Sequence, residues 1–261
     1  MGKIISDRSE INELLALAIR VGGEAADLLS QRPEILELST KSSAMDIVTQ
    51  MDKASEAHIV KSILEVRPDD GMIGEEGASR PTQSGVTWVI DPLDGTVNYF
   101  YGLPGWNVSI AAKDESGAIV GCVTAPTINS RWHASRGGGA FLNDSRISCN
   151  DPIELNRALI GTGFSYDVTE REEQLRQVAL LLPRCRDIRR FGAAAVDLCC
   201  VASGQLDGYF EAGLMEWDLA AGALIASEAG ARVTKENGPT RSFTLAAGPY
   251  LHPLMAQALA E

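Results

Sequence analysis

Histidine is scarce in this sequence: His58, His133 and His252 are the only three, and they are widely separated. The sequence therefore offers no histidine cluster for a zinc site, and it argues against a phosphohistidine mechanism. The five cysteines form no C-x-x-C pair, and none of them begins the C-x5-R pattern of a cysteine phosphatase. We interpret them as small apolar side chains of a protein in a reducing compartment.

Long apolar runs are also missing. No stretch approaches the roughly 18 apolar residues of a transmembrane helix, and the N-terminal segment MGKIISDRSE lacks the apolar region of a signal peptide. The G-x-x-x-x-G-K-[ST] motif of P-loop proteins is absent as well. We therefore expect a cytoplasmic protein that does not act at a membrane.

Basic residues are outnumbered by acidic ones. The chain has 23 Lys and Arg against 35 Asp and Glu, for a formal net charge of −12. Because binding to nucleic acid depends on cations that neutralise phosphates, we expect no nucleic acid partner. An acidic protein that binds an anionic substrate needs compensating positive charge, which bound divalent cations would supply.

The order of apolar patterns predicts a mixed α/β protein, and 261 residues are enough to build a substantial core. The pair Asp151-Pro152 marks a change of pattern. We divide the chain there into an N-terminal α+β subdomain, 1–150, and a C-terminal α/β subdomain, 151–261. The expected helices are 8–29, 50–66, 169–182, 193–202 and 217–229. The expected strands are 72–73, 88–90, 107–113, 119–125, 131–134, 158–162 and 206–210, with antiparallel pairing in the segments from 107 to 134.

The segment from Asp91 to Asn98, D-P-L-D-G-T-V-N, is the richest in chemistry. It follows the apolar strand 88–90, which we expect to end at Asp91. Gly95 permits a turn whose backbone N–H groups can converge on an anion, and a helix that begins near Thr96 would also favour phosphate.

The spacing of the two carboxylates in this segment separates two kinds of phosphatase. Asp91 and Asp94 are three residues apart, whereas the nucleophile and acid in the D-x-D-G-T motif of aspartyl-phosphate phosphatases are two apart. In an extended chain, residues two apart face the same side and residues three apart do not. The spacing therefore fits two metal ligands around a turn better than a nucleophile and its acid.

Two further carboxylates complete the set. Glu75 follows a short strand in the sequence G-E-E-G, and Asp218 opens an apolar helix, where an aspartate is often only a cap. With Asp91 and Asp94 they make four carboxylates. Oxygen-only ligands select hard cations, so Mg²⁺ is favoured over Zn²⁺. Two ions held by a shared carboxylate can clamp both the attacking and the leaving oxygen of a phosphoryl displacement.

Three motifs carry a family resemblance: G-E-E at Glu75, D-P-L-D-G-T-V-N after W-V-I at Asp91, and W-D-L-A-A-G at Trp217. In order and spacing they resemble the signatures of the inositol monophosphatase family of lithium-sensitive phosphatases. The resemblance covers nearly the whole chain and includes Lys41-Ser42-Ser43 and the segment from Gly137 to Phe141. It implies a layered α-β-α-β-α sandwich of the inositol monophosphatase and fructose-1,6-bisphosphatase type, a homodimer, and Mg²⁺-dependent hydrolysis of a small phosphate monoester.

The resemblance also implies a set of metal ligands for two to three Mg²⁺ ions per site. Glu75, the side chain of Asp91 and the backbone carbonyl of Leu93 would hold the first ion. Asp91, Asp94 and Asp218 would hold the second, and a third, weaker ion would also contact Glu75.

The catalytic and substrate-binding residues follow from the same resemblance. Gly95 and Thr96 would offer backbone N–H groups to the phosphate. Thr96 with Asp52, together with Glu75, would orient and activate the attacking water. A further hypothesis makes Asp94 the group that passes a proton, through a water, to the leaving alkoxide. The substrate pocket would be lined by Gly192, Ala194 and Glu211, of which Glu211 would contact a substrate hydroxyl.

Some positions depart from the family pattern. Ala193 stands where a hydroxyl residue is frequent, Glu216 adds a negative charge near the pocket rim, and Tyr99-Phe100-Tyr101 makes an aromatic loop after the metal motif. We expect each of these differences to affect the choice of substrate.

Inositol 1-phosphate is the leading substrate in this interpretation. Histidinol phosphate is the alternative, because its cationic amine would suit Glu211 and Glu216. Fructose 1,6-bisphosphate and 3′-phosphoadenosine 5′-phosphate carry a second phosphate, for which only Arg189 and Arg190 are candidates. A regulatory binding protein on the same fold is a different class of function, against which the four intact carboxylates argue.

Overall fold

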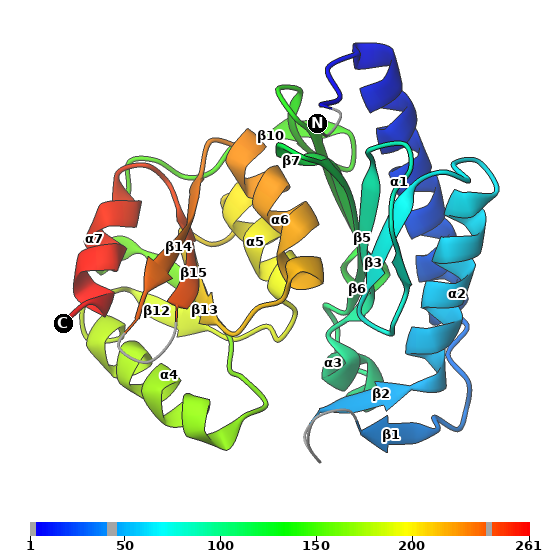
Figure 1. Cartoon of the computed structure of the whole chain (residues 1–261). Helices are drawn as coiled ribbons and strands as arrows, with labels where there is room; N and C mark the ends of the chain where they lie inside the picture. The colour runs from blue at the N-terminus through cyan, green and yellow to red at the C-terminus, as the bar shows by residue number, and fades with distance from the viewer. Residues whose placement is uncertain (1–3, 41–45, 239–241) are drawn as a thin grey trace.

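Helices and sheets alternate in layers. The computed structural model describes residues 4–40, 46–238 and 242–261, and the Lys41-Ser42-Ser43 part of the resemblance lies outside these ranges. Figure 1 shows α1 and α2 on one face of a large sheet, α5 and α6 between that sheet and a smaller one, and α4 and α7 on the outer face of the smaller sheet. The expected α-β-α-β-α arrangement is confirmed. The long helices are α1 (Arg8–Ser30), α2 (Gln50–Leu64), α4 (Val168–Leu181), α5 (Ala194–Ala202), α6 (Glu216–Glu228) and α7 (Leu251–Leu259).

The large sheet has eight strands in the order β10-β9-β8-β7-β6-β5-β3-β4. Its neighbouring strands are antiparallel, as expected for 107–134, except that β3 runs parallel to β5. The carboxyl ends of β3 and β5 therefore meet at one edge of the sheet. The strands are β3 (Gly71–Gly74), β4 (Ser79–Arg80), β5 (Thr87–Asp94), β6 (Asn107–Asp114), β7 (Gly117–Ala125), β8 (Ser130–Ser135), β9 (Gly139–Leu142) and β10 (Ser145–Ile147).

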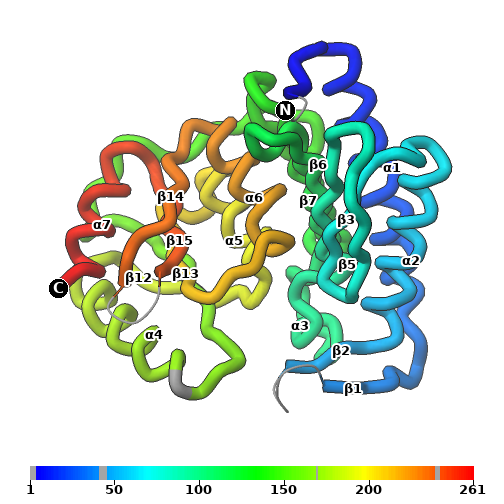
Figure 2. Tube along the Cα trace, viewed as in Figure 1, coloured from blue at the N-terminus to red at the C-terminus, as the bar shows by residue number. Residues whose placement is uncertain are grey.

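The smaller sheet has five strands in the order β12-β11-β13-β15-β14. β11 runs parallel to both β12 and β13, whereas β15 is antiparallel to β13 and β14. Figure 2 traces the chain from α1, beside the large sheet, to the C-terminus at α7, beside the small one. The strands are β11 (Leu159–Thr162), β12 (Asp187–Arg189), β13 (Gly208–Ala212), β14 (Arg232–Asn237) and β15 (Ser242–Ala247), and a separate ribbon pairs β1 (Leu38–Thr40) with β2 (Ile47–Thr49).

The core explains why the helices lie where they do. Asp7 caps α1 by accepting the Ser9 N–H, and the apolar stripe of α1 packs on the large sheet. On the opposite face α6 approaches β7 very closely, because a Cβ at Gly121 would lie 2.9 Å from the Cα of Ala221. This contact fixes the N-terminal end of α6, which holds Asp218, relative to the sheet that holds Asp91.

Several expectations about local structure were wrong. β5 does not end at Asp91 but continues to Asp94. The aromatic segment Tyr99-Phe100-Tyr101 is not a loop but the end of helix α3 (Thr96–Tyr101), because Gly95 lets the chain turn directly into a helix. The pattern also gave no elements after residue 230, where the structure has β14, β15 and α7. No helix among the described residues combines the length and the apolar character needed to cross a bilayer.

Candidate active site

A cavity of about 290 Å³ lies between the edge of the large sheet and the loops of the small one. It brings together residues as far apart in the sequence as Asp46 and Asp218. Asp52 is the only predicted site residue that does not line it, and Asp52 touches the cavity wall through Thr96. The predicted site residues in the lining are Glu75, Asp91, Leu93, Asp94, Gly95, Thr96, Gly192, Ala194, Glu211 and Asp218.

A bulge at the end of β5 presents two carboxylates to the cavity. Asp91 pairs with Ser109 on β6, but the register shifts before Asp94 pairs with Asn107. The shift removes the strict alternation of a regular strand, so residues three apart can both face the cavity. The N–H of Leu93 donates to the Asp91 carboxylate over 3.1 Å and so holds the bulge. Both carboxylates line the cavity as expected, although a bulged strand presents them rather than a turn, and their role as metal ligands stays a prediction.

Asp94 is held by donors from both halves of the molecule. Its Oδ2 accepts a hydrogen bond from the Asn107 side chain over 2.8 Å and another from the Ala195 backbone N–H, at the start of α5, over 3.0 Å. Burial raises the pKa of Asp94, and these hydrogen bonds oppose the rise without cancelling it. The orientation of this carboxylate is therefore fixed before any ligand binds.

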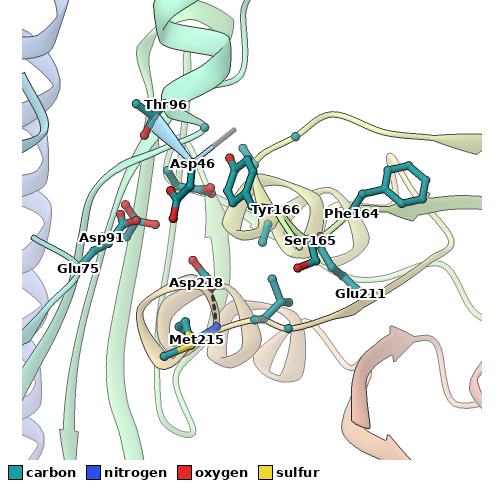
Figure 3. Close-up of a pocket in the computed structure, with 18 of the residues that line it drawn as sticks. Asp46, Glu75, Asp91, Thr96, Phe164, Ser165, Tyr166, Glu211, Met215 and Asp218 are labelled. Atoms are coloured by element: carbon teal, nitrogen blue, oxygen red, sulfur yellow. Dashed lines mark hydrogen bonds between the residues drawn. The ribbon is translucent and has the colours of Figure 1, made fainter. Parts of the chain in front are cut away.

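Glu75 and Asp218 reach the cavity from opposite walls (Figure 3). Glu75 follows β3, where its N–H bonds the Ile90 carbonyl of β5, and this places it beside Asp91. Asp218 lies in the first turn of α6, where its Oδ2 accepts the Met215 N–H over 2.6 Å. The capping role considered for Asp218 is therefore real, and the same side chain also lines the cavity.

The negative charges in the cavity repel one another. Burial raises the pKa of Asp91 well above its ordinary value, and the neighbouring charges of Glu75, Asp94 and Asp218 raise it further. The pKa of Asp218 is raised well above its ordinary value by burial and by Asp94. Such a group of carboxylates is costly without a cation.

The donor set fits a hard divalent cation in its chemistry, because the described residues of the cavity lining offer carboxylate and carbonyl oxygens and include no cysteine or histidine. As they stand, however, no three acidic, histidine or cysteine side chains of residues 4–40, 46–238 and 242–261 lie close enough together to hold an ion. Figure 3 shows why, since Glu75 and Asp91 lie together and Asp218 lies across the cavity. The carboxylates thus provide the charge and the donors of a metal site without forming a closed coordination shell.

A series of buried hydrogen bonds supports the turn after β5. Thr96 donates its hydroxyl proton toward Asp52 Oδ1, 2.9 Å away, and toward the Leu93 carbonyl, 3.1 Å away. The other oxygen of Asp52 accepts from the N–H and the hydroxyl of Thr49, at 2.8 and 2.6 Å. Gly95 precedes Thr96 in the left-handed region at φ 85°, where a residue with a Cβ would be strained.

Glu211 enters the cavity from β13 on the side of the small sheet. The Tyr209 hydroxyl donates to it over 2.5 Å. Burial raises the pKa of Glu211 to about 7, although the Tyr209 hydrogen bond and the positive charge of Arg190 lower it. A Cβ at Gly163 would fall 1.9 Å from Glu211 Oε2, so the space for this carboxylate depends on glycine at that position.

The structure separates the sequence differences that touch the cavity from those that do not. Ala193 lines it, as expected. Glu216 does not, because it pairs with Lys113 instead. Tyr99-Phe100-Tyr101 also lies outside the lining, since Tyr99 is buried with its hydroxyl on the Leu29 carbonyl. The aromatic segment and Glu216 therefore lie outside the cavity lining, and their effect on the choice of substrate stays a prediction.

Sequence reasoning also missed residues that line the cavity. Ser165 and Tyr166, between β11 and α4, form part of its wall (Figure 3). Their signal was weak, because a single G-T-G-F-S-Y segment after a short strand resembles any turn. Asp197 is a further buried carboxyl near the site. Burial raises its pKa well above the ordinary value, and Glu211 adds to the rise.

Comparisons with known proteins agree with this geometry. A sequence profile of the inositol monophosphatase family matches residues 7–261. The inositol-1-monophosphatase SuhB of Mycobacterium tuberculosis is 40% identical over 264 residues, which cover 92% of this chain and 91% of the relative. The Nus factor SuhB of Pasteurella multocida is 42% identical over 233 residues, which cover 87% of each chain.

Solved structures give the same result. The crystal structure of the extragenic suppressor protein suhB from Bartonella henselae matches with a TM-score of 0.89 and 30% identity, over 95% of this chain and 99% of that one. An inositol monophosphatase from Anabaena matches with a TM-score of 0.84 and 31% identity, over 96% of both chains. The chain therefore belongs to the inositol monophosphatase family, and it is a phosphatase.

Proposed function

We propose that this protein hydrolyses inositol 1-phosphate to inositol and phosphate with the help of two to three Mg²⁺ ions. The observation that supports the proposal most directly is that Asp91, Asp94 and Glu75 share one cavity with Thr96, whose hydroxyl donates to the buried Asp52 behind the cavity wall. Such a site holds negative charge for cations on one side and an acceptor for a water proton on the other.

The proposed metal ligands are Glu75, Asp91, the Leu93 carbonyl, Asp94 and Asp218. When bound, the ions would neutralise charge on the phosphoryl group and lower the pKa of a water near it. The chain itself fixes the ligands, since Asn107 and Ala195 orient Asp94, and Met215 orients Asp218. These hydrogen bonds fix the orientation of each carboxylate on its own wall, and ion binding would have to bring Asp218 closer to Glu75 and Asp91.

The proposed proton acceptor is Thr96. Its only hydroxyl proton is directed to Asp52 and the Leu93 carbonyl, so the lone pairs of its oxygen remain available to the O–H of an attacking water. Asp52 is in turn fixed by Thr49. Asp94 remains a proposed route, through a water, for the proton that the leaving alkoxide needs. We propose that the backbone N–H groups of Gly95 and Thr96 face the phosphate.

The organic part of the substrate would lie between Glu211 and the segment Gly192–Ala194. A carboxylate can accept a hydrogen bond from a polyol hydroxyl, and Glu211 lies on the cavity wall with its other contact to Tyr209. The pairing of Glu216 with Lys113 removes one of the two acidic groups that would have favoured the amine of histidinol phosphate. The cavity thus favours a neutral polyol, and histidinol phosphate remains the second choice.

We also propose a homodimer in the cytoplasm. A groove of about 500 Å³ is lined by apolar residues that are exposed in the single chain, including Leu103, Ile128 and Phe191. Exposed apolar patches of this kind mark interfaces, and twofold dimers are the commonest closed assembly. All five cysteines are free thiols, in keeping with a reducing compartment.

Phosphate release from four esters, with and without Mg²⁺, tests the proposal: inositol 1-phosphate, histidinol phosphate, fructose 1,6-bisphosphate and 3′-phosphoadenosine 5′-phosphate. We expect Mg²⁺-dependent turnover, fastest with inositol 1-phosphate, and an added Li⁺ series tests lithium sensitivity. Faster phosphate release from another of these esters would change the proposed substrate and leave the proposed chemistry unchanged.

A partner-binding role is the second candidate, because the relatives named Nus factor SuhB are as similar to this chain as the relatives named inositol-1-monophosphatase. A folded protein that binds Mg²⁺ and releases phosphate from none of the four esters would favour this role.

A further inference from the structure

The segment Gly163–Tyr166 forms a cavity wall to which the family motifs assign no role. Figure 3 shows Tyr166 beside the cavity, between Asp46 and Ser165, whereas Phe164 points away from the carboxylates. Tyr166 is half-buried and lines the cavity, and its hydroxyl makes no hydrogen bond within the described ranges. An aromatic ring and an unused hydroxyl therefore face the space where the organic part of the ester would lie.

This wall is anchored by Gln174 of α4. The side-chain oxygen of Gln174 accepts the Ser165 N–H over 2.8 Å, and its amide nitrogen donates to the Ala212 carbonyl over 3.3 Å. Arg171 adds a hydrogen bond from its Nε to the Ser165 carbonyl over 2.6 Å. Gln174 is only 3% exposed, so both of its bonds are protected from water.

Gln174 thereby joins the two loops that flank the organic part of the site. One loop holds Ser165 and Tyr166, and the other follows Ala212, the last residue of β13 and the neighbour of Glu211. Gln174 therefore links the backbone next to Tyr166 to the backbone next to Glu211, and Arg171 adds a second bond on the Tyr166 side. A side chain in this place can control the fit of a substrate without touching it.

We propose that Tyr166 selects cyclic polyol monoesters by placing its ring against the C–H face of the polyol, and that Gln174 is the positioning residue that holds Tyr166 opposite Glu211. The inference rests on the proposed function and deepens it by naming the residue that recognises the organic group of the substrate. A ring polyol has apolar C–H faces and a rim of hydroxyls, which suit an aromatic face and a carboxylate at the two sides of one cavity.

The environment of Tyr166 is consistent with this role. Burial raises the pKa of its phenol to about 12, so the hydroxyl stays neutral and can donate to the substrate near pH 7. An acyclic ester such as glycerol 2-phosphate offers no ring face, and its binding should depend on the metals and the phosphate contacts alone. Selectivity between the two esters is thus the quantity that Tyr166 controls.

The test is a comparison of steady-state kinetics with inositol 1-phosphate and glycerol 2-phosphate at saturating Mg²⁺. For Tyr166→Ala we expect KM for inositol 1-phosphate to rise about tenfold with kcat changed less than about threefold, and KM for glycerol 2-phosphate to stay within about twofold. Tyr166→Phe keeps the ring and should restore most of the affinity. Gln174→Met, close in volume but unable to make either bond, should shift KM in the same selective way.

Leu175→Ala is the matched control. Leu175 directly follows Gln174 in α4, but its side chain is 58% exposed and lies outside the cavity lining. It should change neither KM. An unchanged KM for inositol 1-phosphate in Tyr166→Ala, or an equal rise for both esters, would overturn the inference and leave the proposed function intact. A wild-type protein that hydrolyses glycerol 2-phosphate but not inositol 1-phosphate would overturn the proposed substrate and this inference together.

Discussion

Thr96 donates its hydroxyl proton to Asp52 over 2.9 Å, although the two residues lie 44 positions apart. Both are almost fully buried, and the second oxygen of Asp52 is taken by Thr49. A hydroxyl that donates inward can only accept from the cavity side. The Thr96 oxygen therefore faces the cavity as a proton acceptor for a water, while the Asp52 carboxylate on the far side accepts the hydroxyl proton of Thr96.

Replacing Thr96 by Val should lower kcat by about 10²–10³, because general-base assistance commonly contributes 10²–10⁴. KM should change little, since Val keeps the shape of Thr and the backbone N–H. Thr96→Ser restores the hydroxyl and should recover most of kcat. Initial rates of phosphate release measure both constants, and a Val variant with wild-type kcat would remove Thr96 from the reaction.

Local patterns were enough to predict the parts of the site that depend on one segment. The D-P-L-D-G-T sequence alone indicated a strand followed by a glycine turn, and the structure has both at Asp91–Thr96. The bulge between Asp91 and Asp94 could not be predicted, because it depends on the register with Ser109 and Asn107 of a neighbouring strand. The prediction that β5 ends at Asp91 failed for that reason.

Contacts between distant segments had no pattern to reveal them. Nothing in the sequence marks Gln174 within the expected helix 169–182, yet its side chain is buried and forms hydrogen bonds to two separate segments. Likewise Glu216 looked available to a substrate until its partner Lys113, 103 positions away, was known. The family motifs named the carboxylates but gave no information about Tyr166, since its role depends on how the small sheet faces the large one.

Magnesium should stabilise the protein measurably, because the carboxylates around Asp91 repel one another without a cation. We expect millimolar Mg²⁺ to raise Tm by several degrees in differential scanning fluorimetry. Asp91→Asn should raise Tm in EDTA, since it removes one repelling charge, and should reduce the shift on adding Mg²⁺. As a control, Asp27→Asn on the exposed face of α1 should alter neither value. Equal Mg²⁺ shifts in the wild type and Asp91→Asn would count against Asp91 as a ligand.

The stability contribution of Glu211 should depend on pH. Its carboxyl ionises near pH 7 in the folded protein and near 4.5 when unfolded, because burial disfavours the charge. Between these values the unfolded chain binds fewer protons, so the free energy of unfolding falls as pH rises through that window. The Gln side chain of Glu211→Gln still accepts the Tyr209 hydrogen bond but does not ionise, so the free energy of unfolding of this variant should not fall in the same way.

In EDTA, the advantage of Glu211→Gln over wild type should therefore grow from pH 5 to pH 8, by up to about 3 kcal/mol if the whole pKa difference is expressed. Urea unfolding at both pH values measures it. Glu13→Gln, an exposed site on α1, serves as the reference variant. An advantage that is the same at pH 5 and pH 8 would show that the carboxyl is not destabilised by burial.

Gly163 should be intolerant of even one methyl group. A Cβ there would lie within 2.3 Å of all three carboxyl atoms of Glu211, so Gly163→Ala must displace that side chain. We expect KM for inositol 1-phosphate to rise at least about tenfold, as for loss of a substrate hydrogen bond. In the Glu211→Ala background the same change should have almost no further effect. Gly23→Ala in α1, where a Cβ meets nothing within 4 Å, should leave kinetics unchanged and slightly raise Tm.

The proposed dimer should depend on the apolar groove at Leu103. Leu103 is 51% exposed in the single chain, and burying an apolar side chain of this size in a partner contributes about 1.5–3 kcal/mol. A glutamate there would leave a charge without a partner in the contact, and in a twofold dimer the change acts twice. Leu103→Glu should therefore shift the mass measured by light scattering toward the monomer at micromolar concentration. Leu175→Glu, at a similarly exposed leucine on α4, should not change the mass.

The groove also adjoins the active site. Because the Phe191 carbonyl of this groove accepts a hydrogen bond from Asn98, and Phe191 directly precedes Gly192 of the cavity, the monomer should also have a raised KM. A Leu103→Glu protein that remains dimeric would place the interface on another surface.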